Sequence, residues 1–194
     1  MPFWPSSKSK RPSSPPASRK SALRENVESI LWAVAVAMLI RTFIMAPFKI
    51  PSGSMRPTLI EGDRILVNKF VYRFQEPERG DIIVFRYPLD RKRPFIKRLV
   101  GKGGDTVTIQ DGQIIVNGHP LDGRGIFEKN VYLNQGDYGQ EGQVIQVPID
   151  ALFVLGDNSQ ASSDSRFWGF VPRPLLIGRA MCIFWPVTRW RVLE

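Results

Sequence analysis

The sequence contains a single cysteine, Cys182, and a single histidine, His119, in 194 residues. One cysteine excludes an internal disulfide bond, and two such side chains are too few for a zinc site with several His or Cys ligands. His119 stands in the segment VNGHPL, where a histidine on a surface turn is far more common than a catalytic one. We therefore predict neither a metal nor a cofactor, so hydrolytic chemistry would have to proceed without a histidine base.

Acidic residues are missing from the first 24 positions, which are rich in serine, proline and basic residues. This composition is typical of a disordered tail, and we assign residues 1–26 to a basic cytoplasmic tail. An organellar transit peptide has a similar composition. However, the five prolines between positions 2 and 16 prevent the amphipathic helix that such a peptide forms.

The net charge of +9 is unevenly distributed along the chain. Six basic residues lie ahead of the one long apolar run, opposed only by Glu25 and by Glu28 at its start, and the later basic residues are dispersed among acidic ones. The basic cluster Arg91, Lys92 and Arg93 is typical of a solvated loop, because the aromatic and arginine pattern of a nucleic-acid module does not accompany it. We predict no nucleic-acid partner.

The long apolar run covers residues 27–46, VESILWAVAVAMLIRTFIMA. As an α-helix that starts at Val27, with the Arg41 side chain extended toward the lipid headgroups, it is long enough to cross a hydrocarbon core of ~30 Å. A buried core helix is less well supported, because nothing downstream is suited to cover a helix that is apolar on all sides. A cleaved signal peptide also fits less well, since no small-x-small pattern precedes Pro47. We predict an uncleaved single transmembrane anchor, with the basic N-terminus in the cytoplasm and residues 47–194 outside it.

Downstream of this run the pattern changes to short segments rich in Val, Ile and Phe, separated by Gly, Pro and Asp. Such segments predict a mainly β domain, and DTVTIQDGQIIVNG predicts a hairpin with Asp111 and Gly112 as its two-residue turn. We assign residues 106–150 to a small β-rich inserted subdomain, in which residues 122–146 are rich in glycine and poorly patterned. The other predicted strands lie in DRILVNKFVY, DIIVFRYP, FIKRLVGK, ALFVLGD and IGRAMCIFW.

Two serines one residue apart, Ser52 and Ser54, lie in the segment PSGSMRPTL, just after the apolar run. Such a segment is ordinarily a turn, but a hydroxyl there becomes a nucleophile if a base activates it. Lys97 is suited to be that base, because the predicted strand PFIKRLVG surrounds it with apolar residues that disfavour its charged form. By themselves these residues leave two interpretations open: a turn and an edge lysine, or a serine nucleophile with a lysine base.

Five segments resemble, in order and spacing, the successive sequence boxes of the type I signal peptidases. These are the bacterial leader peptidases that remove signal peptides from exported preproteins. The resemblance covers the apolar run and nearly all of the downstream chain, and it leaves out the N-terminal tail and the insertion at 106–150. The five segments are PSGSMRPTL, GDRILVNKF, RGDIIVFRYP, FIKRLVGKGGD and GDNSQASSDSRFWGFV.

The resemblance implies a Ser/Lys dyad on an all-β signal-peptidase-type catalytic domain. Ser54 matches the nucleophile and Lys97 matches the general base. Ser52 would contribute its hydroxyl to an oxyanion hole, which the backbone N–H of Ser54 completes.

In the last box the resemblance implies supporting roles. Ser162 matches a serine that orients the lysine, and Asp157, Asp164 and Arg166 match residues that hold the loop through hydrogen bonds and ion pairs. The family usually reads G-D-N-R-D-N-S, whereas this chain has Ser159 and Gln160 after its G-D-N. We expect this departure to alter the usual ion pairing of the loop but not the dyad.

The substrate class that the resemblance implies is a signal peptide with small side chains one and three residues before the cut. Extended along FKIPS and FIKR, the peptide would place these side chains in shallow pockets. For each lining residue, ordinary core packing is the alternative. The predicted lining consists of Phe48, Ile50, Pro51, Met55, Leu59, Ile65, Phe95 and Ile96.

We therefore predict a serine endopeptidase of the bacterial cytoplasmic membrane that removes N-terminal signal peptides. Its predicted partners are exported preproteins and membrane lipid, and its catalytic domain is extracytoplasmic. The alternative is a membrane-anchored binding protein that keeps the same fold without catalysis.

Overall fold

The computed structural model describes residues 19–39, 44–121 and 126–193. By its contacts the chain divides into two units, Met1–Leu39 and Ile40–Glu194. The described part of the first unit is the helix α1 (Arg19–Leu39), which begins before the predicted boundary at Val27. Good helix formers and the absence of Pro and Gly after Pro16 explain this earlier start.

The predicted anchor, residues 27–46, is described only in part. Its first portion lies in α1, residues 40–43 fall outside the described residues, and Met45 and Ala46 begin the first β-strand. Within the described ranges, no helix combines the length and the apolar character needed to cross a membrane. The anchor therefore stays a prediction.

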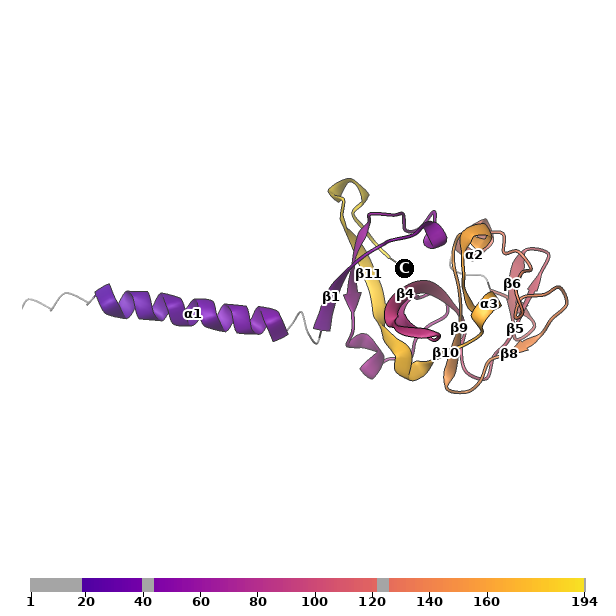
Figure 1. The fold of residues 1–194 in the computed structure, drawn as a ribbon, viewed down its shortest axis with the longest axis horizontal. Helices are drawn as coiled ribbons and strands as arrows, with labels where there is room; N and C mark the ends of the chain where they lie inside the picture. Colours follow the sequence, from indigo (N-terminus) through magenta and orange to yellow (C-terminus); the bar gives the residue numbers. More distant parts are fainter. Residues whose placement is uncertain (1–18, 40–43, 122–125, 194) are drawn as a thin grey trace, which may run out of the picture. The chain divides into compact units, whose positions relative to one another are not determined.

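The main sheet of the second unit (Figure 1) is antiparallel throughout. This agrees with the predicted mainly β domain, and each of the sequence segments named above for the main sheet contains a strand. In spatial order its strands are β1 (Met45–Lys49), β2 (Arg64–Asn68), β11 (Leu176–Trp185), β3 (Ile82–Tyr87), β4 (Asp90–Gly101), β9 (Ala151–Leu155) and β10 (Val171–Pro172), while β12 (Arg191–Val192) pairs with β11.

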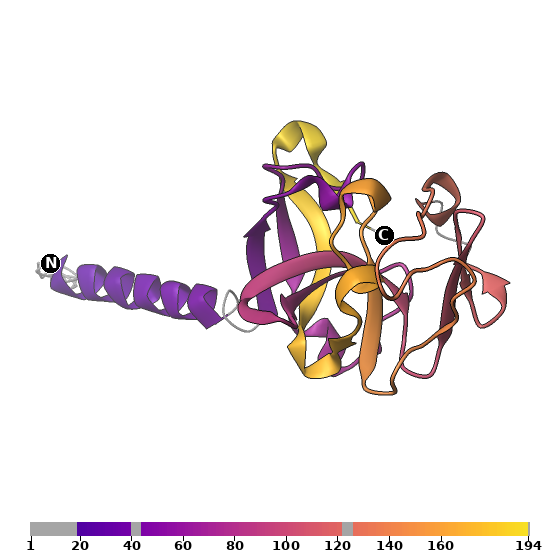
Figure 2. The same ribbon diagram turned by 45° about the vertical axis from the view of Figure 1, so that its right-hand side comes forward.

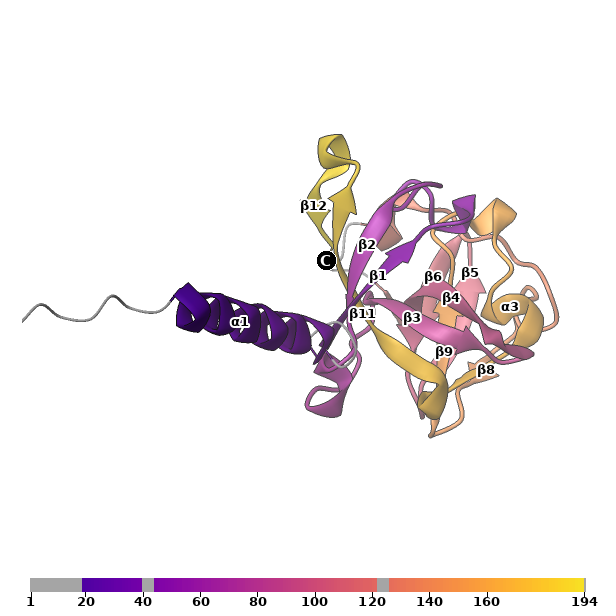
Figure 3. The same cartoon turned by 60° about the vertical axis from the view of Figure 1, so that its left-hand side comes forward.

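The strand β11 joins the two halves of this sheet. Its first residues pair with β3 and its later residues pair with β2, and the register shifts in both pairings. Such irregularities bend a strand and increase its twist. Figure 3 shows β11 running from β3 and β9 to β2 and β12. The bend brings β1 and the N-terminal part of β4 to the same cavity, which Phe48 and Phe95 both line.

The predicted hairpin is confirmed in a second sheet. Its strands β5 (Thr106–Gln110) and β6 (Gln113–Val116) are joined by Asp111 and Gly112, which have φ angles of 51° and 77°, as a type I′ turn requires. The sheet is completed by β7 (His119–Pro120), next to β6, and β8 (Ile145–Gln146), next to β5.

The two sheets lie side by side (Figures 1 and 2) and share a hydrophobic core. Val107 and Ile109 of β5 pack in one cluster with Val100 of β4 and with Phe153 and Leu155 of β9. The predicted insertion, residues 106–150, is therefore a second sheet that packs on the first.

Candidate active site

Ser54 lies in the short 3₁₀-helix η2 (Gly53–Met55), which follows β1. Its side chain is buried, with 7% of the residue exposed. Ser52 stands at the N-cap of this helix in an extended conformation, and its side chain makes no capping hydrogen bond. The Ser52 hydroxyl, 3.5 Å from Ser54 Oγ, is thus directed to the neighbouring serine instead of the helix.

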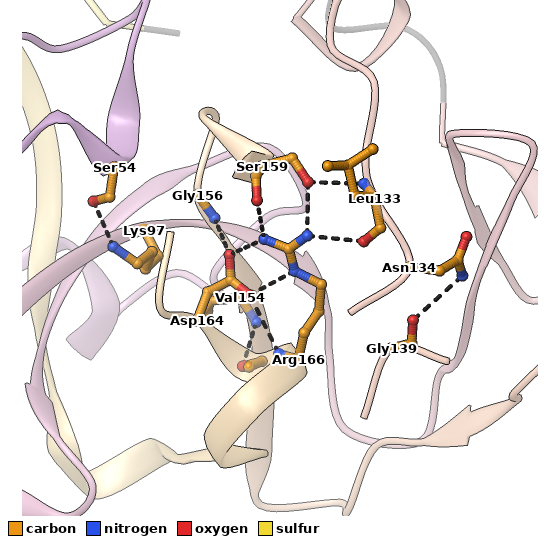
Figure 4. Close-up of polar contacts among 11 residues, drawn as sticks. Ser54, Lys97, Leu133, Asn134, Gly139, Val154, Gly156, Ser159, Asp164 and Arg166 are labelled. Atoms are coloured by element: carbon orange, nitrogen blue, oxygen red, sulfur yellow. Dashed lines mark hydrogen bonds and ion pairs between the residues drawn. The ribbon is translucent and has the colours of Figure 1, made fainter. Parts of the chain in front are cut away.

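Lys97 lies on β4, opposite Ile83 of β3, and only 4% of the residue is exposed. Its Nζ forms a hydrogen bond of 2.7 Å with Ser54 Oγ (Figure 4), although 43 positions separate the two residues. The Nζ also lies 5.6 Å from the centre of the Phe95 ring. A serine hydroxyl and a lysine amine are therefore in direct contact within a mainly apolar environment.

Burial lowers the pKa of Lys97 from its ordinary value of 10.5 to about 8, because desolvation disfavours the ammonium. The carboxylates of Asp164 and Asp157 oppose this shift by attracting the positive charge, and Arg166 adds to it by repulsion. With a pKa of about 8, roughly a tenth of the side chains are neutral at pH 7. The amine is thus able to accept a proton near neutral pH.

The peptide group between Gly53 and Ser54 is held at its carbonyl, which accepts from Asn158 Nδ2 at 3.2 Å and from the Arg56 N–H at 3.1 Å. That carbonyl and the Ser54 N–H belong to one trans peptide group and point in opposite directions. Fixing the carbonyl therefore fixes the N–H, which lies in the first turn of η2, where helical N–H groups have no intrahelical acceptor. Asn158 N–H also donates to the Ser54 carbonyl at 3.0 Å, so one residue holds both sides of the nucleophile.

Gly156 allows Ser54 and the last sequence box to approach each other. A Cβ atom at this position would lie 2.5 Å from the Ser54 carbonyl oxygen and 2.1 Å from Ser162 Oγ. Real Cβ atoms do not come so close to other atoms, so any side chain at 156 would displace Ser54 or Ser162.

Two buried ion pairs hold this last box. Asp157 accepts two hydrogen bonds of 2.7 Å from Arg98, the residue after Lys97, and Arg98 also donates to the Gly80 carbonyl. Asp164 binds Arg166 through both of its oxygens, at 2.8 and 2.9 Å, and neither side chain is exposed. Ion pairing thus persists in the loop despite the departure at 159 and 160.

The predicted hydrogen bond between Ser162 and Lys97 is not present. Ser162 Oγ is buried and has no hydrogen-bond partner within the described part of the chain. Its hydroxyl packs against Gly156, and Lys97 Nζ instead bonds to Ser54. The orienting role of Ser162 stays a prediction.

An apolar cavity of about 310 Å³ lies next to the dyad residues, between β1 and β4. Met55 and Leu59, which we predicted in its lining, are instead fully buried in the core beneath η2, because the turn after Ser54 directs them inward. Six predicted residues do line it, Phe48, Ile50, Pro51, Ile65, Phe95 and Ile96, together with Lys49, Val84, Arg93 and Pro94.

Sequence reasoning assigned no role to Asn158, Ser159, Arg98 or Val84. Asn158 belongs to the matched G-D-N box, so its position could have been noted, but its contact with Gly53 joins residues 105 positions apart. Arg98 follows the dyad lysine directly and carries a buried charge, which in an apolar strand signals an acidic partner.

A serine hydroxyl against a buried lysine amine, beside an apolar cavity, is the arrangement expected of a serine hydrolase with a lysine base. Residues 23–185 match the family model described as signal peptidase, peptidase S26. The chain therefore belongs to this family of signal peptidases, serine endopeptidases that remove signal peptides.

Named relatives agree with this assignment. The chain is 44% identical over 190 residues to signal peptidase I of Leptolyngbya laminosa, covering 92% of this chain and 89% of the relative. It is 42% identical over 187 residues to probable signal peptidase I-2 of Synechocystis, covering 93% and 80%. Signal peptidase I of Aquifex aeolicus is 33% identical over 216 residues, covering 84% of each chain. The alternative of a non-catalytic binding protein is not favoured.

Proposed function

We propose that this signal peptidase cleaves its substrate with Ser54 as the nucleophile and Lys97 as the general base. The observation that carries the proposal is the contact of 2.7 Å between Ser54 Oγ and a lysine amine that burial makes easier to deprotonate. A serine hydroxyl needs an adjacent base, and a desolvated lysine is a suitable one.

In acylation, neutral Lys97 takes the proton of Ser54 Oγ while the oxygen attacks the carbonyl carbon of the scissile bond. The resulting oxyanion accepts hydrogen bonds from the Ser52 hydroxyl and the Ser54 N–H, which stabilise charge that is absent from the substrate. Lys97 then gives its proton to the leaving amine, and the peptide bond breaks. The new N-terminus departs, and the signal peptide stays as an ester on Ser54.

In deacylation, Lys97 is neutral again and takes a proton from a water molecule. The hydroxide attacks the ester carbonyl, and the Ser54 oxygen leaves with the proton that Lys97 returns to it. The buried Ser162 hydroxyl, which has no hydrogen-bond partner within the described residues, would accept from Lys97 while the lysine is an ammonium, the orienting role predicted from the sequence.

Cleavage after a small-x-small motif is supported by the cavity beside the dyad. Its walls are mostly apolar, which suits the uncharged side chains of such a motif. One wall is β1, the first strand in the sheet order, so one of its edges has no neighbouring strand within the described part of the sheet. The other wall is Pro94–Ile96 of β4, which pairs with β3 on one edge only, because the pairing of β4 with β9 starts at Arg98. An extended peptide can therefore add main-chain hydrogen bonds there.

We also propose that residues 27–46 anchor the enzyme in the bacterial cytoplasmic membrane, with the catalytic domain outside the cytoplasm. The described apolar side chains of α1 support this, since Ile30, Leu31 and Trp32 are each more than 60% exposed. Ser54 follows the anchor by only a few residues, so it would lie near the bilayer surface, where a signal peptide leaves the membrane.

The test is cleavage of a preprotein in detergent or lipid by the Ser54→Ala and Lys97→Ala variants. We expect both to lose turnover by about 10⁴-fold or more, since dyad members act as a unit. Lys92→Ala, which removes an exposed lysine from the same strand, serves as the matched control and should keep full activity. Turnover by either dyad variant in folded form, as judged by circular dichroism, would refute the dyad.

A further inference from the structure

Ser159 is the residue at which this chain departs from the family's usual arginine, and its side chain is a junction of hydrogen bonds. Its Oγ accepts from Arg166 Nη1 at 2.6 Å and from the backbone N–H of Leu133 at 2.8 Å. Its carbonyl accepts from Arg166 Nη2 at 2.9 Å. Only 5% of Ser159 is exposed, so these bonds are shielded from water.

The glycine-rich segment 133–139 encloses Arg166 from the other side. The Leu133 carbonyl accepts from Arg166 Nη1 at 2.9 Å, and the Tyr138 N–H donates to the Arg166 carbonyl at 2.8 Å. A Cβ atom on Gly139 would lie 2.5 Å from the Gln135 carbonyl oxygen and 2.8 Å from Arg166 Cγ, so glycine allows the segment both to fold on itself and to approach Arg166. We call Ser159 together with segment 133–139 the Arg166 clasp.

Hydrogen bonds of Asn134 connect the Arg166 clasp to the second sheet. Asn134 Nδ2 donates to the carbonyl of Ile109 on β5 at 3.0 Å. It also donates to the Gly139 carbonyl at 3.3 Å (Figure 4). The segment that the sequence marked only as glycine-rich and poorly patterned thus connects the second sheet to Arg166.

Arg166 is in turn connected to Ser54 through Asp164 and Gly156. It binds both oxygens of Asp164, and Asp164 Oδ2 accepts from the N–H of Gly156 at 3.0 Å. Gly156 is the residue against which Ser162 and the Ser54 carbonyl pack. We infer that the Arg166 clasp is a positioning device of this chain. It holds the Arg166–Asp164 pair, and through it the loop that orients Lys97 and Ser54, so that Ser159 replaces the family's arginine as a positioning residue. This inference rests on the proposed dyad.

The charges of Asp164 and Arg166 allow the clasp to be tested through the pKa of Lys97. Asp164 raises the pKa of Lys97 and Arg166 lowers it, so the effect of the pair depends on where both groups are held. Asp164 keeps its bond to the Gly156 N–H without the clasp, whereas Arg166 loses a partner. Weakening the clasp should therefore release Arg166, and the pKa of Lys97 should rise.

The experiment measures kcat, KM and the pH dependence of kcat for Ser159→Ala in the full chain with a preprotein substrate. We expect kcat to fall by about ten- to a hundredfold with little change in KM, as for a slightly misplaced catalytic group. The alkaline rise in kcat should move to higher pH. Ser159→Thr, which keeps the hydroxyl, should restore most of the rate and the original pH profile.

Ser163→Ala removes an exposed hydroxyl from the same loop and is the matched control. Wild-type kcat and pH profile in folded Ser159→Ala would overturn the inference, as would a rate loss that Ser159→Thr does not repair. If Ser159→Ala unfolds at the assay temperature, Gly139→Ala decides, because it presses on Arg166 from the other side and should show the same pH shift. Ser54→Ala, assayed in parallel, tests the dyad, and activity of this variant refutes the proposed function. If Ser54→Ala is inactive while Ser159→Ala behaves like the wild type, only the inference about the clasp is refuted.

Discussion

At the scale of single residues, Lys97 combines a functional and an energetic effect. The amine must lose water to become a base, and the same desolvation costs folding free energy. In the unfolded chain the lysine titrates near 10.5, and in the folded protein at about 8. Between these pH values the unfolded state binds more protons, so the free energy of unfolding rises with pH across this window. Below pH 8 Lys97 is charged in both states, so its desolvation lowers the free energy of unfolding by the full amount.

Because the burial that makes Lys97 a base also costs folding free energy, we predict that Lys97→Leu is inactive and more stable than the wild type. An apolar side chain of similar size avoids the desolvation cost, and we expect a gain of roughly 1–3 kcal/mol at pH 7 that shrinks above pH 8. Urea unfolding at several pH values measures it. If Lys97→Leu is less stable than the wild type at pH 7, burial of the charged lysine does not destabilise the fold as argued.

The wild-type enzyme should show an alkaline rise in kcat with a midpoint at about pH 8, where the amine becomes neutral. Preprotein cleavage between pH 6 and 10 measures this midpoint. A midpoint near 10.5, the ordinary pKa of lysine, would mean that burial does not tune Lys97.

At the scale of elements, the active site depends on contact between two short helices, η2 and η4 (Ser159–Ala161), that belong to opposite ends of the catalytic domain's sequence. Asn158, at the N-cap of η4, reaches the Gly53 carbonyl at the start of η2. The peptide group that contains the Ser54 N–H is therefore held both from within η2, by the Arg56 N–H, and from η4, by Asn158.

Asn158→Leu should test this contact between helices. It removes the side-chain donor and keeps the backbone bond to the Ser54 carbonyl, so we expect kcat to fall by about 10–10²-fold with KM nearly unchanged, because the oxyanion forms only in the transition state. Steady-state kinetics provides the measurement. Gln160→Leu, at an exposed position of η4, is the control. An increase in KM alone would show that Asn158 acts on substrate binding instead.

At the scale of the whole molecule, the strands were predictable because their signals are local, and so was the choice of Ser54 and Lys97 as candidates. Alternating apolar residues marked β2 and β5, and the sequence boxes marked Ser54 and Lys97. The clasp was not predictable, since Ser159 and Leu133 lie on different segments and only the packed sheets bring them together. Met55 was misplaced for a related reason, because a short helix after β1 turns it into the core.

The whole chain also predicts how the enzyme responds to general inhibitors. Cys182 is its only thiol, and it lies on β11, away from the dyad residues on η2 and β4. We expect thiol reagents and chelators to leave preprotein cleavage at its full rate. Strong inhibition by EDTA in a cleavage assay would require a metal in the mechanism.

The position of β11 has a consequence for how the enzyme comes into being. The hairpin of β1 and β2 carries Ser54 at its turn, the hairpin of β3 and β4 carries Lys97, and the sheet joins the two through β11 alone. That strand, Leu176–Trp185, follows both hairpins in the sequence. The sheet therefore joins the Ser54 and Lys97 hairpins only after a distant strand has paired with both, and non-local pairing of this kind slows folding.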